Sequence, residues 1–444
     1  MLFAPRDREI LVLAVPALFA LVCEPLFLLV DTAVVGSLGT VPQAGLGIAA
    51  AVLATAVNLF VFLAYATTAS VARTLGAGDL PGALAGGIDG LWLAAGLGIA
   101  AALVTGLGAP VLVDLFGAEP AVAHQAVTYL VWSAPGVPAM LVVLAATGVL
   151  RGLQDTRTPL AVAAGGSVVN AVLNLVLVRG TGLRIAGSGL GTALTQAGMA
   201  VVTVVVVGRG ARRRGVSLRP RPAGIRAGGV AGLPLLVRTL ALRATLLLTT
   251  YAATRLGVAQ LAAHQIVSSL WTLLALTLDA LAIAAQALTG RALGAGDVAG
   301  TRAATARMVR WGVGGGAVTG AVLLAVHGLV EPLFSADPAV RGAMGAAVVV
   351  AAVMQPLAGY VFVLDGVLIG AGDGRYLALT ALVQLAVYAP LVGLVLHGGP
   401  VGTAGLVWLW IAFSGGWMAV RGIFLGLRAR GGAWLVTGAP PSLP

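Results

Sequence analysis

Long apolar segments recur along almost the whole chain, and they constrain its fold more than any other feature. Most are about 20 to 28 residues long, and an α-helix needs about 20 apolar residues to cross the roughly 30 Å hydrocarbon core of a bilayer. Hydrophobic residues make up 59% of the 444 residues and charged residues only 9%, and the mean hydropathy is +1.03. A water-soluble globule could not bury this much apolar surface. The sequence therefore predicts an all-α polytopic membrane protein.

We assign twelve transmembrane helices to these segments. The first begins close to the amino terminus, and no small-residue cleavage site follows it, so we interpret it as a spanning helix and not as a signal peptide. The predicted spans are residues 10–35, 44–70, 84–108, 123–150, 159–178, 185–208, 228–253, 259–290, 303–328, 340–369, 376–396 and 401–426.

An internal repeat divides the chain into two halves. ARTLGAGD, which ends at Asp79, recurs as GRALGAGD, which ends at Asp297, and the same 218-residue offset relates Pro16 to Pro234. Because each repeat holds six spans, we expect two parallel six-helix lobes, related by a pseudo-twofold axis along the membrane normal, around a central cleft. The predicted domains are an N-terminal lobe (1–208), a basic linker (209–227), a C-terminal lobe (228–430) and a tail (431–444).

The basic residues predict the orientation of the chain. All 26 are arginines, and seven of them lie in RGARRRGVSLRPRPAGIR, from Arg209 to Arg226, which has no acidic residue. Positively charged connections remain in the cytoplasm, so with an even number of spans both termini are expected there, in a multi-pass protein of the inner membrane. Nucleic-acid binding is disfavoured, although the net charge is +11, because the arginines lie in short connections without a soluble scaffold.

The chain lacks the residues that metal binding, ATP hydrolysis and common enzymatic mechanisms require. The chain has one cysteine, Cys23, no lysine for a phosphate-binding loop, no HExxH motif and four dispersed histidines. We therefore expect no metal, no cofactor and no enzymatic activity. GAGD occurs at Gly76–Asp79, Gly294–Asp297 and Gly370–Asp373. Inside a helix it would suggest an intramembrane aspartyl protease, but each copy closes a span, so we interpret its Gly and Asp as helix caps.

Two acids in the first span are the strongest functional candidates. Glu24 and Asp31 lie seven residues apart, on one face of the helix, and the first half offers no base at membrane depth to pair with them. A carboxylate kept from water without a partner readily takes up a proton or a cation. Asn170 and Asn174 on the fifth span would complete an ion-coupling site, beside possible cavity residues Asn58, Tyr65, Thr192 and Gln196.

The second half carries ions of both signs at membrane depth. We expect Arg238 or Arg243 to pair with Asp279 or Asp365, because isolated charges there are costly. Such a network favours gating or structure over direct substrate binding. On the eighth span, Gln265, Thr272, Asp279 and Gln286 repeat every seven residues and could line a cavity beside His264, or simply hold helices together.

The chain resembles the multidrug and toxic compound extrusion (MATE) transporters, and in particular their DinF-like branch. The resemblance rests on VDTAVVGSLG from Val30, the two GAGD segments, GVLRGLQDTRTPL from Gly148 and AGSGLGTAL from Ala186. It implies a two-lobed antiporter that exports organic cations or lipophilic compounds in exchange for protons or sodium. It also implies that Asp31 takes part in proton coupling in the first lobe.

Two departures from the family pattern bear on the coupling ion. Asn174 stands where many relatives have a carboxylate on the fifth span, and Leu242 and Arg243 occupy the region of a seventh-span carboxylate found in sodium-type sites. We therefore expect proton-coupled efflux by alternating access, from a monomer that handles small molecules within the lipid bilayer. Sodium-coupled antiport and a lipid-linked oligosaccharide flippase remain the alternatives, and a membrane-embedded enzyme is the least supported.

Overall fold

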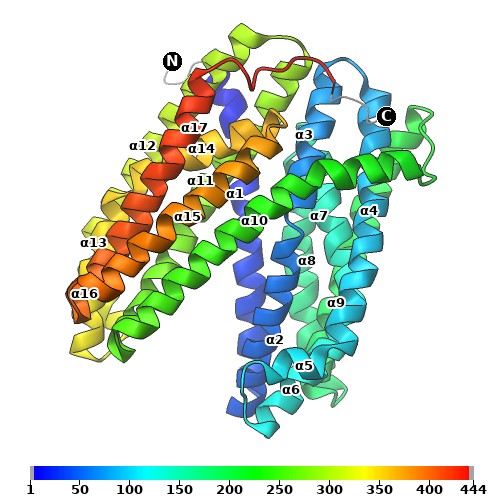
Figure 1. Cartoon of the computed structure of the whole chain (residues 1–444). Coiled ribbons are helices and arrows are strands. Elements are labelled where there is room, and N and C mark those ends of the chain that lie inside the picture. The colour runs from blue at the N-terminus through cyan, green and yellow to red at the C-terminus, as the bar shows by residue number, and fades with distance from the viewer. Residues whose placement is uncertain (1–4, 440–444) are drawn as a thin grey trace. The chain divides into compact units, whose positions relative to one another are not determined.

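The computed structural model describes residues 5–439, which form α-helices joined by short connections (Figure 1). The helices of the first half are α1 (Pro5–Gly36), α2 (Thr40–Leu59), α3 (Phe62–Gly76), α4 (Leu80–Leu107), α5 (Ala109–Asp114), α6 (Pro120–Ser133), the 3₁₀ turn η1 (Ala134–Gly136), α7 (Val137–Gly152), α8 (Arg157–Leu175), the π-helix η2 (Val176–Gly180) and α9 (Arg184–Arg213). Those of the second half are α10 (Pro222–Leu256), α11 (Val258–Gly294), α12 (Val298–Phe334), α13 (Pro338–Val353), α14 (Gln355–Gly370), α15 (Gly374–Gly398), α16 (Gly402–Trp410), the π-helix η3 (Ile411–Trp417) and α17 (Met418–Arg430).

The membrane spans agree with the prediction. Within residues 5–439, eleven helices or continuous helix runs are long and apolar enough to cross a bilayer. The pair α13 and α14 is bent by 52° at its junction, and it forms a twelfth span if the two helices count as one. Large apolar side chains such as Leu107, Leu247 and Leu333 are more than two-thirds exposed. This is the surface expected of helices that face lipid.

The chain forms two compact units, each with its own helical core. Of the described residues, the N-terminal unit consists of Val15–Gly232 with residues 438–439, and the C-terminal unit consists of Leu233–Thr437 with residues 5–14. Their boundaries therefore fall inside α1 and α10, just before Pro16 and Pro234. These two prolines are related by the 218-residue repeat, so the two halves of the sequence divide at matching positions.

The repeat is also visible in how the helices pack. In the N-terminal unit α7 packs against α3 and α4, and in the C-terminal unit the related helix α14 packs against α11 and α12. The membrane span that contains each of these helices is interrupted at a matching place, at Gly136 for α7 and at Met354 for α14. Pro138 and Pro356 follow these breaks, and a proline cannot donate the backbone hydrogen bond that would continue the helix.

The GAGD segments close helices as predicted, with one difference. Asp79 and Asp297 cap the following helices by accepting hydrogen bonds from Gly82 N and Gly300 N, both at 2.7 Å. Asp373 makes no such cap. Its carboxylate instead accepts hydrogen bonds from Arg428 of α17, at 2.6 and 3.1 Å. The third copy of the motif therefore joins two helices of the C-terminal unit.

The predicted basic linker is mostly helical. Helix α9 continues to Arg213 and α10 begins at Pro222, so only residues 214–221 of the predicted stretch 209–227 lie between helices. This short connection is fixed to α4: Arg221 forms an ion pair with the buried Asp89 at 2.6 Å, and Trp92 donates a hydrogen bond to Leu218 O at 3.0 Å.

Candidate functional site

Asp31 lies near the end of α1 and is almost completely buried, with 1% of its surface exposed. Three neutral side chains donate hydrogen bonds to its carboxylate. Asn174 Nδ2 of α8 lies 2.6 Å from Asp31 Oδ1, while Tyr129 OH of α6 and Thr192 Oγ1 of α9 lie 3.3 and 3.4 Å from Oδ2. Four helices of the N-terminal unit therefore converge on one acid.

Asn170 and Asn174 form the floor of this site, as their i, i+4 spacing on one helix predicts. Both are fully buried, and Asn174 Nδ2 also donates to Asn170 Oδ1 at 3.0 Å. Asn174 Oδ1 and Asn170 Nδ2 have no hydrogen-bond partner in the described chain. The site therefore holds one unused acceptor and one unused donor close to the acid.

The surroundings of Asp31 carry no compensating charge. Every group that hydrogen-bonds to its carboxylate is an amide or a hydroxyl, and Asp31 forms no ion pair within residues 5–439. A buried carboxylate without a counter-ion is costly in a membrane protein. Taking up a proton removes that cost without adding a new ligand.

Glu24 does not join this cluster. Its side chain is exposed, and it forms no hydrogen bond within the described residues. Seven residues of α-helix place it on the same face as Asp31 but about 10.5 Å away along the axis. That distance is too long for a direct contact between the two carboxylates, so the same face does not mean the same site.

The other predicted residues of the N-terminal unit also stand apart from Asp31. Asn58 Nδ2 donates to Ala54 O at 2.8 Å, beside the break between α2 and α3. Tyr65 of α3 and Gln196 of α9 are half-buried. None of the three hydrogen-bonds to the acid. The structure thus brings together Asp31, Asn170, Asn174 and Thr192, and adds Tyr129.

In the C-terminal unit the predicted Arg and Asp pairing is present for one combination. Arg238 of α10 forms a bidentate ion pair with Asp365 of α14, and both are buried. Arg243 is exposed and forms no ion pair with the described part of the chain, and Asp279 is half-buried. A third ion, Arg421 of α17, lies 3.6 Å from Asp365 Oδ2.

His264 is buried against the aromatic rings of the same unit. Its Nε2 lies 3.4 Å from Thr250 Oγ1 and 3.3 Å from Ser268 Oγ, and its ring centroid is 5.8 Å from that of Trp410. Gln265 is exposed and Gln286 is buried, so the seven-residue stripe of α11 does not face one environment. In the described residues no group of three or more His, Cys, Asp or Glu could hold a metal ion.

The repeat shows that the acid cluster belongs to one unit only. Thr249 is the repeat partner of Asp31, and Tyr388 is that of Asn170. These two residues hydrogen-bond to each other at 2.7 Å and are buried. The C-terminal unit thus keeps a polar contact at the matching position but without an ionisable carboxyl group.

Sequence reasoning missed Tyr129 and Arg421. Tyr129 lies among other polar residues of its span, such as Gln125 and Thr128, and nothing in their spacing singles it out. Only the packing of α6 against α9 brings it beside Thr192 and the acid. Arg421 lies within the predicted last span, 401–426. A count of every charge inside the assigned spans would have found it.

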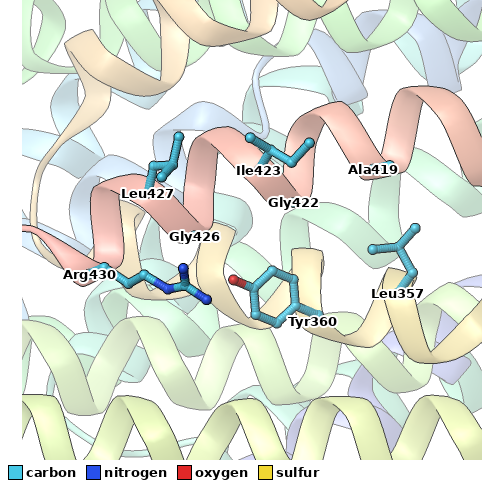
Figure 2. Close-up of a pocket in the computed structure, with 8 residues that line it drawn as sticks. All are labelled: Leu357, Tyr360, Ala419, Gly422, Ile423, Gly426, Leu427 and Arg430. Carbon is cyan, nitrogen blue, oxygen red and sulfur yellow. The ribbon is translucent and has the colours of Figure 1, made fainter.

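A surface cavity of about 330 Å³ lies elsewhere, between α14 and α17 (Figure 2). Its walls are apolar apart from Tyr360 and Arg430, and a side chain at Gly426 would collide with the Tyr360 hydroxyl. None of the predicted site residues lines it.

Comparison with known proteins identifies the family to which the chain is related. The MatE family model matches residues 16–176 and again residues 234–394, and these two stretches are related by the 218-residue offset of the repeat. The chain belongs to the MatE family. This membership confirms the predicted resemblance, and since MatE proteins are transporters, it supports the expectation that the chain is not an enzyme.

Individual relatives match the chain over most of its length. Protein DETOXIFICATION 44, chloroplastic, of Arabidopsis thaliana is 31% identical, over 96% of this chain and 81% of that protein. DNA damage-inducible protein F of Escherichia coli (strain K12) is 30% identical, over 66% of this chain and 64% of that protein. The crystal structure of the Vibrio cholerae MATE transporter VcmN in the bent form has a TM-score of 0.83 at 21% identity, over 97% and 98% of the two chains. This last likeness supports the MatE fold.

Proposed function

We propose that this MatE protein exports organic cations or lipophilic compounds by proton-coupled antiport, with Asp31 as the residue that carries the proton. The observation behind the proposal is the environment of Asp31, a buried carboxylate held by neutral donors and without a counter-ion. A proton neutralises such a group where it stands. Alternating access then couples each change of its charge to a change of conformation.

The asparagine at position 174 supports the proton over sodium. An amide can donate to the ionised acid through Nδ2, and after rotation it can accept from the protonated acid through Oδ1, which has no other partner. A sodium ion instead needs several oxygen ligands around it. Only one carboxylate is available at this site, because the second acid, Glu24, is exposed and forms no hydrogen bond within the described residues.

The proposed function also requires a location and an orientation for the protein. We place it as a monomer in the inner membrane with both termini in the cytoplasm, because the arginine-rich connection between α9 and α10 should stay on that side.

Transport by purified protein in liposomes tests the coupling ion. Ethidium serves as the cationic probe, and a pH gradient or a sodium gradient is imposed separately. We expect efflux to follow the pH gradient and to ignore the sodium gradient. Asp31→Asn keeps the shape of the side chain but is neutral and can neither take up nor release a proton, so it should abolish pH-driven efflux.

Thr55→Ala is the control, because Thr55 lies in the same unit and its exposed side chain bonds only to Ala51 O of its own helix. It should transport nearly as well as the wild type. Undiminished pH-driven efflux by well-folded Asp31→Asn protein would refute the role of Asp31. Efflux driven by sodium alone would refute proton coupling.

A further inference from the structure

Three charged side chains meet inside the C-terminal unit, away from Asp31. Arg238, Asp365 and Arg421 are each less than one-tenth exposed. Arg238 uses Nε and Nη2 to bind both carboxylate oxygens of Asp365. This bidentate geometry is the strongest that an arginine and a carboxylate adopt. Both carboxylate oxygens of Asp365 are therefore bound by Arg238.

Arg421 is left without a good acceptor. Its guanidinium lies 3.6 Å from Asp365 Oδ2, beyond hydrogen-bond distance, and its one hydrogen bond within the described residues goes to Met418 Sδ at 3.9 Å. The ring of Trp417 covers one face at 4.9 Å. Asp279 also attracts it electrostatically. A guanidinium has five N–H donors, and burying them without oxygen acceptors is costly.

Arg428, two turns further along α17, shows what a satisfied arginine looks like in the same setting. It also stacks on an aromatic ring, that of Tyr376 at 4.7 Å. In addition it donates two hydrogen bonds to Asp373, at 2.6 and 3.1 Å. Arg421 has the aromatic ring but lacks this partner. The missing component at Arg421 is an anionic acceptor.

A small cavity opens beside Arg421. Its volume is about 10 Å³, and Arg238, Asp365, Thr380 and Gln384 line it together with Arg421. Gln384 is 3% exposed, yet its amide forms no hydrogen bond within residues 5–439. A cavity of this size holds about one water-sized group. The remaining N–H groups of Arg421 and the amide of Gln384 can both donate to a group that occupies it.

We propose that this cavity is a binding site for a small monovalent anion, held by the Arg421 guanidinium and the Gln384 amide. The negative charge of Asp365 does not prevent this, because Arg238 neutralises it. The anion is a free halide or one oxygen of a small carboxylate, since each presents a hydrogen-bond acceptor to the two donors. Both anions are larger than water, so the cavity must widen to admit them. This site is separate from the proposed coupling at Asp31 and does not depend on it.

Binding of radiolabelled chloride to the full-length protein in detergent micelles tests the site, with gluconate as the bulky counter-ion. We expect saturable binding that Arg421→Gln weakens by at least about tenfold, because a charged donor is lost. Gln384→Leu should weaken it by about threefold to tenfold. Arg421→Lys keeps the charge, so it should retain measurable binding. Formate should compete with chloride, and whichever anion binds more tightly identifies the source.

Two controls separate the site from general effects. Arg428→Gln removes a guanidinium from the same helix and should leave chloride affinity unchanged. Asp31→Asn should also leave it unchanged, even if it abolishes efflux. If Arg421→Gln does not fold, as judged by gel filtration, Gln384→Leu and Arg421→Lys carry the test. Absence of saturable chloride binding by the wild type, or an affinity equal to that of the wild type in both Arg421→Gln and Gln384→Leu, would overturn the proposal.

Discussion

At the scale of single residues, the two units solve the problem of a buried carboxylate in different ways. Asp31 is surrounded by amides and hydroxyls, whereas Asp365 is held by a guanidinium. An ion pair lowers the cost of keeping the charge at all times. Neutral donors leave the charge free to change. This difference separates a group suited to proton exchange from one suited to holding helices together.

Tyr129 contributes one of the three donors to Asp31, so its hydroxyl should matter for transport. Tyr129→Phe keeps the ring and removes this hydrogen bond. A net loss of about 0.5–1.5 kcal/mol corresponds to roughly twofold to tenfold slower pH-driven efflux. Tyr251→Phe is the matched control, because Tyr251 is exposed and belongs to the other unit. Equal rates for the two variants would show that the contact has no role in transport.

The cluster around Asp365 predicts an asymmetry between its partners. Asp365→Ala removes the carboxylate that Arg238 binds and that Arg421 approaches, which should lower the free energy of unfolding by about 3–5 kcal/mol. Arg238→Ala should cost clearly less, because Arg421 already lies 3.6 Å from Asp365 and can take its place.

Denaturation of both variants in detergent measures the difference. The double variant Arg238→Ala with Asp365→Ala should recover part of the loss relative to Asp365→Ala alone. An equal loss from the two single variants would contradict the substitution of one arginine by the other.

At the scale of helices, close packing through glycine positions α12 against α14. Gly312 and Gly359 face each other so closely that a Cβ on Gly312 would lie 2.5 Å from the carbonyl oxygen of Gly359. Small residues allow helices in membranes to approach in this way. Because the obstructing atom belongs to the backbone, it cannot rotate away, so the packing depends on glycine here.

Gly312→Leu should therefore destabilise the protein by at least about 1–3 kcal/mol. Gly314→Leu is the control on the same helix, since a Cβ there meets nothing within 4 Å. Thermal unfolding of the two variants in detergent should separate them clearly. Similar midpoints would show that this crossing does not limit stability.

At the scale of the whole molecule, the length of α9 provides a test of topology. This helix has 30 residues and is about 45 Å long, so its ends should lie on opposite sides of a membrane about 30 Å thick. Ser217 and Thr181 are exposed in the connections that flank it.

Single cysteines at Ser217 and Thr181, each in a Cys23→Ala background, should react with a membrane-impermeant maleimide from opposite sides. We expect Ser217→Cys to be labelled only when the reagent reaches the cytoplasmic face. Labelling of both from the same side would contradict the assigned spans.

The sequence by itself determined the solvent, the number of spans, the repeat and the identity of the acid. Apolar length and spacing are local properties, and an offset of 218 residues can be read without knowing any contact. The same holds for Asn170 and Asn174, because an i, i+4 pair shares one face of its helix.

Only the tertiary structure decided which side chains meet. In the structure Glu24 lies outside the site, Tyr129 of α6 hydrogen-bonds to Asp31, and Arg421 lies beside an aspartate that Arg238 binds. Each of these outcomes depends on how helices distant in sequence are packed together. Hydropathy and spacing describe one helix at a time, and so they contain no information about the distances between helices that determine these contacts.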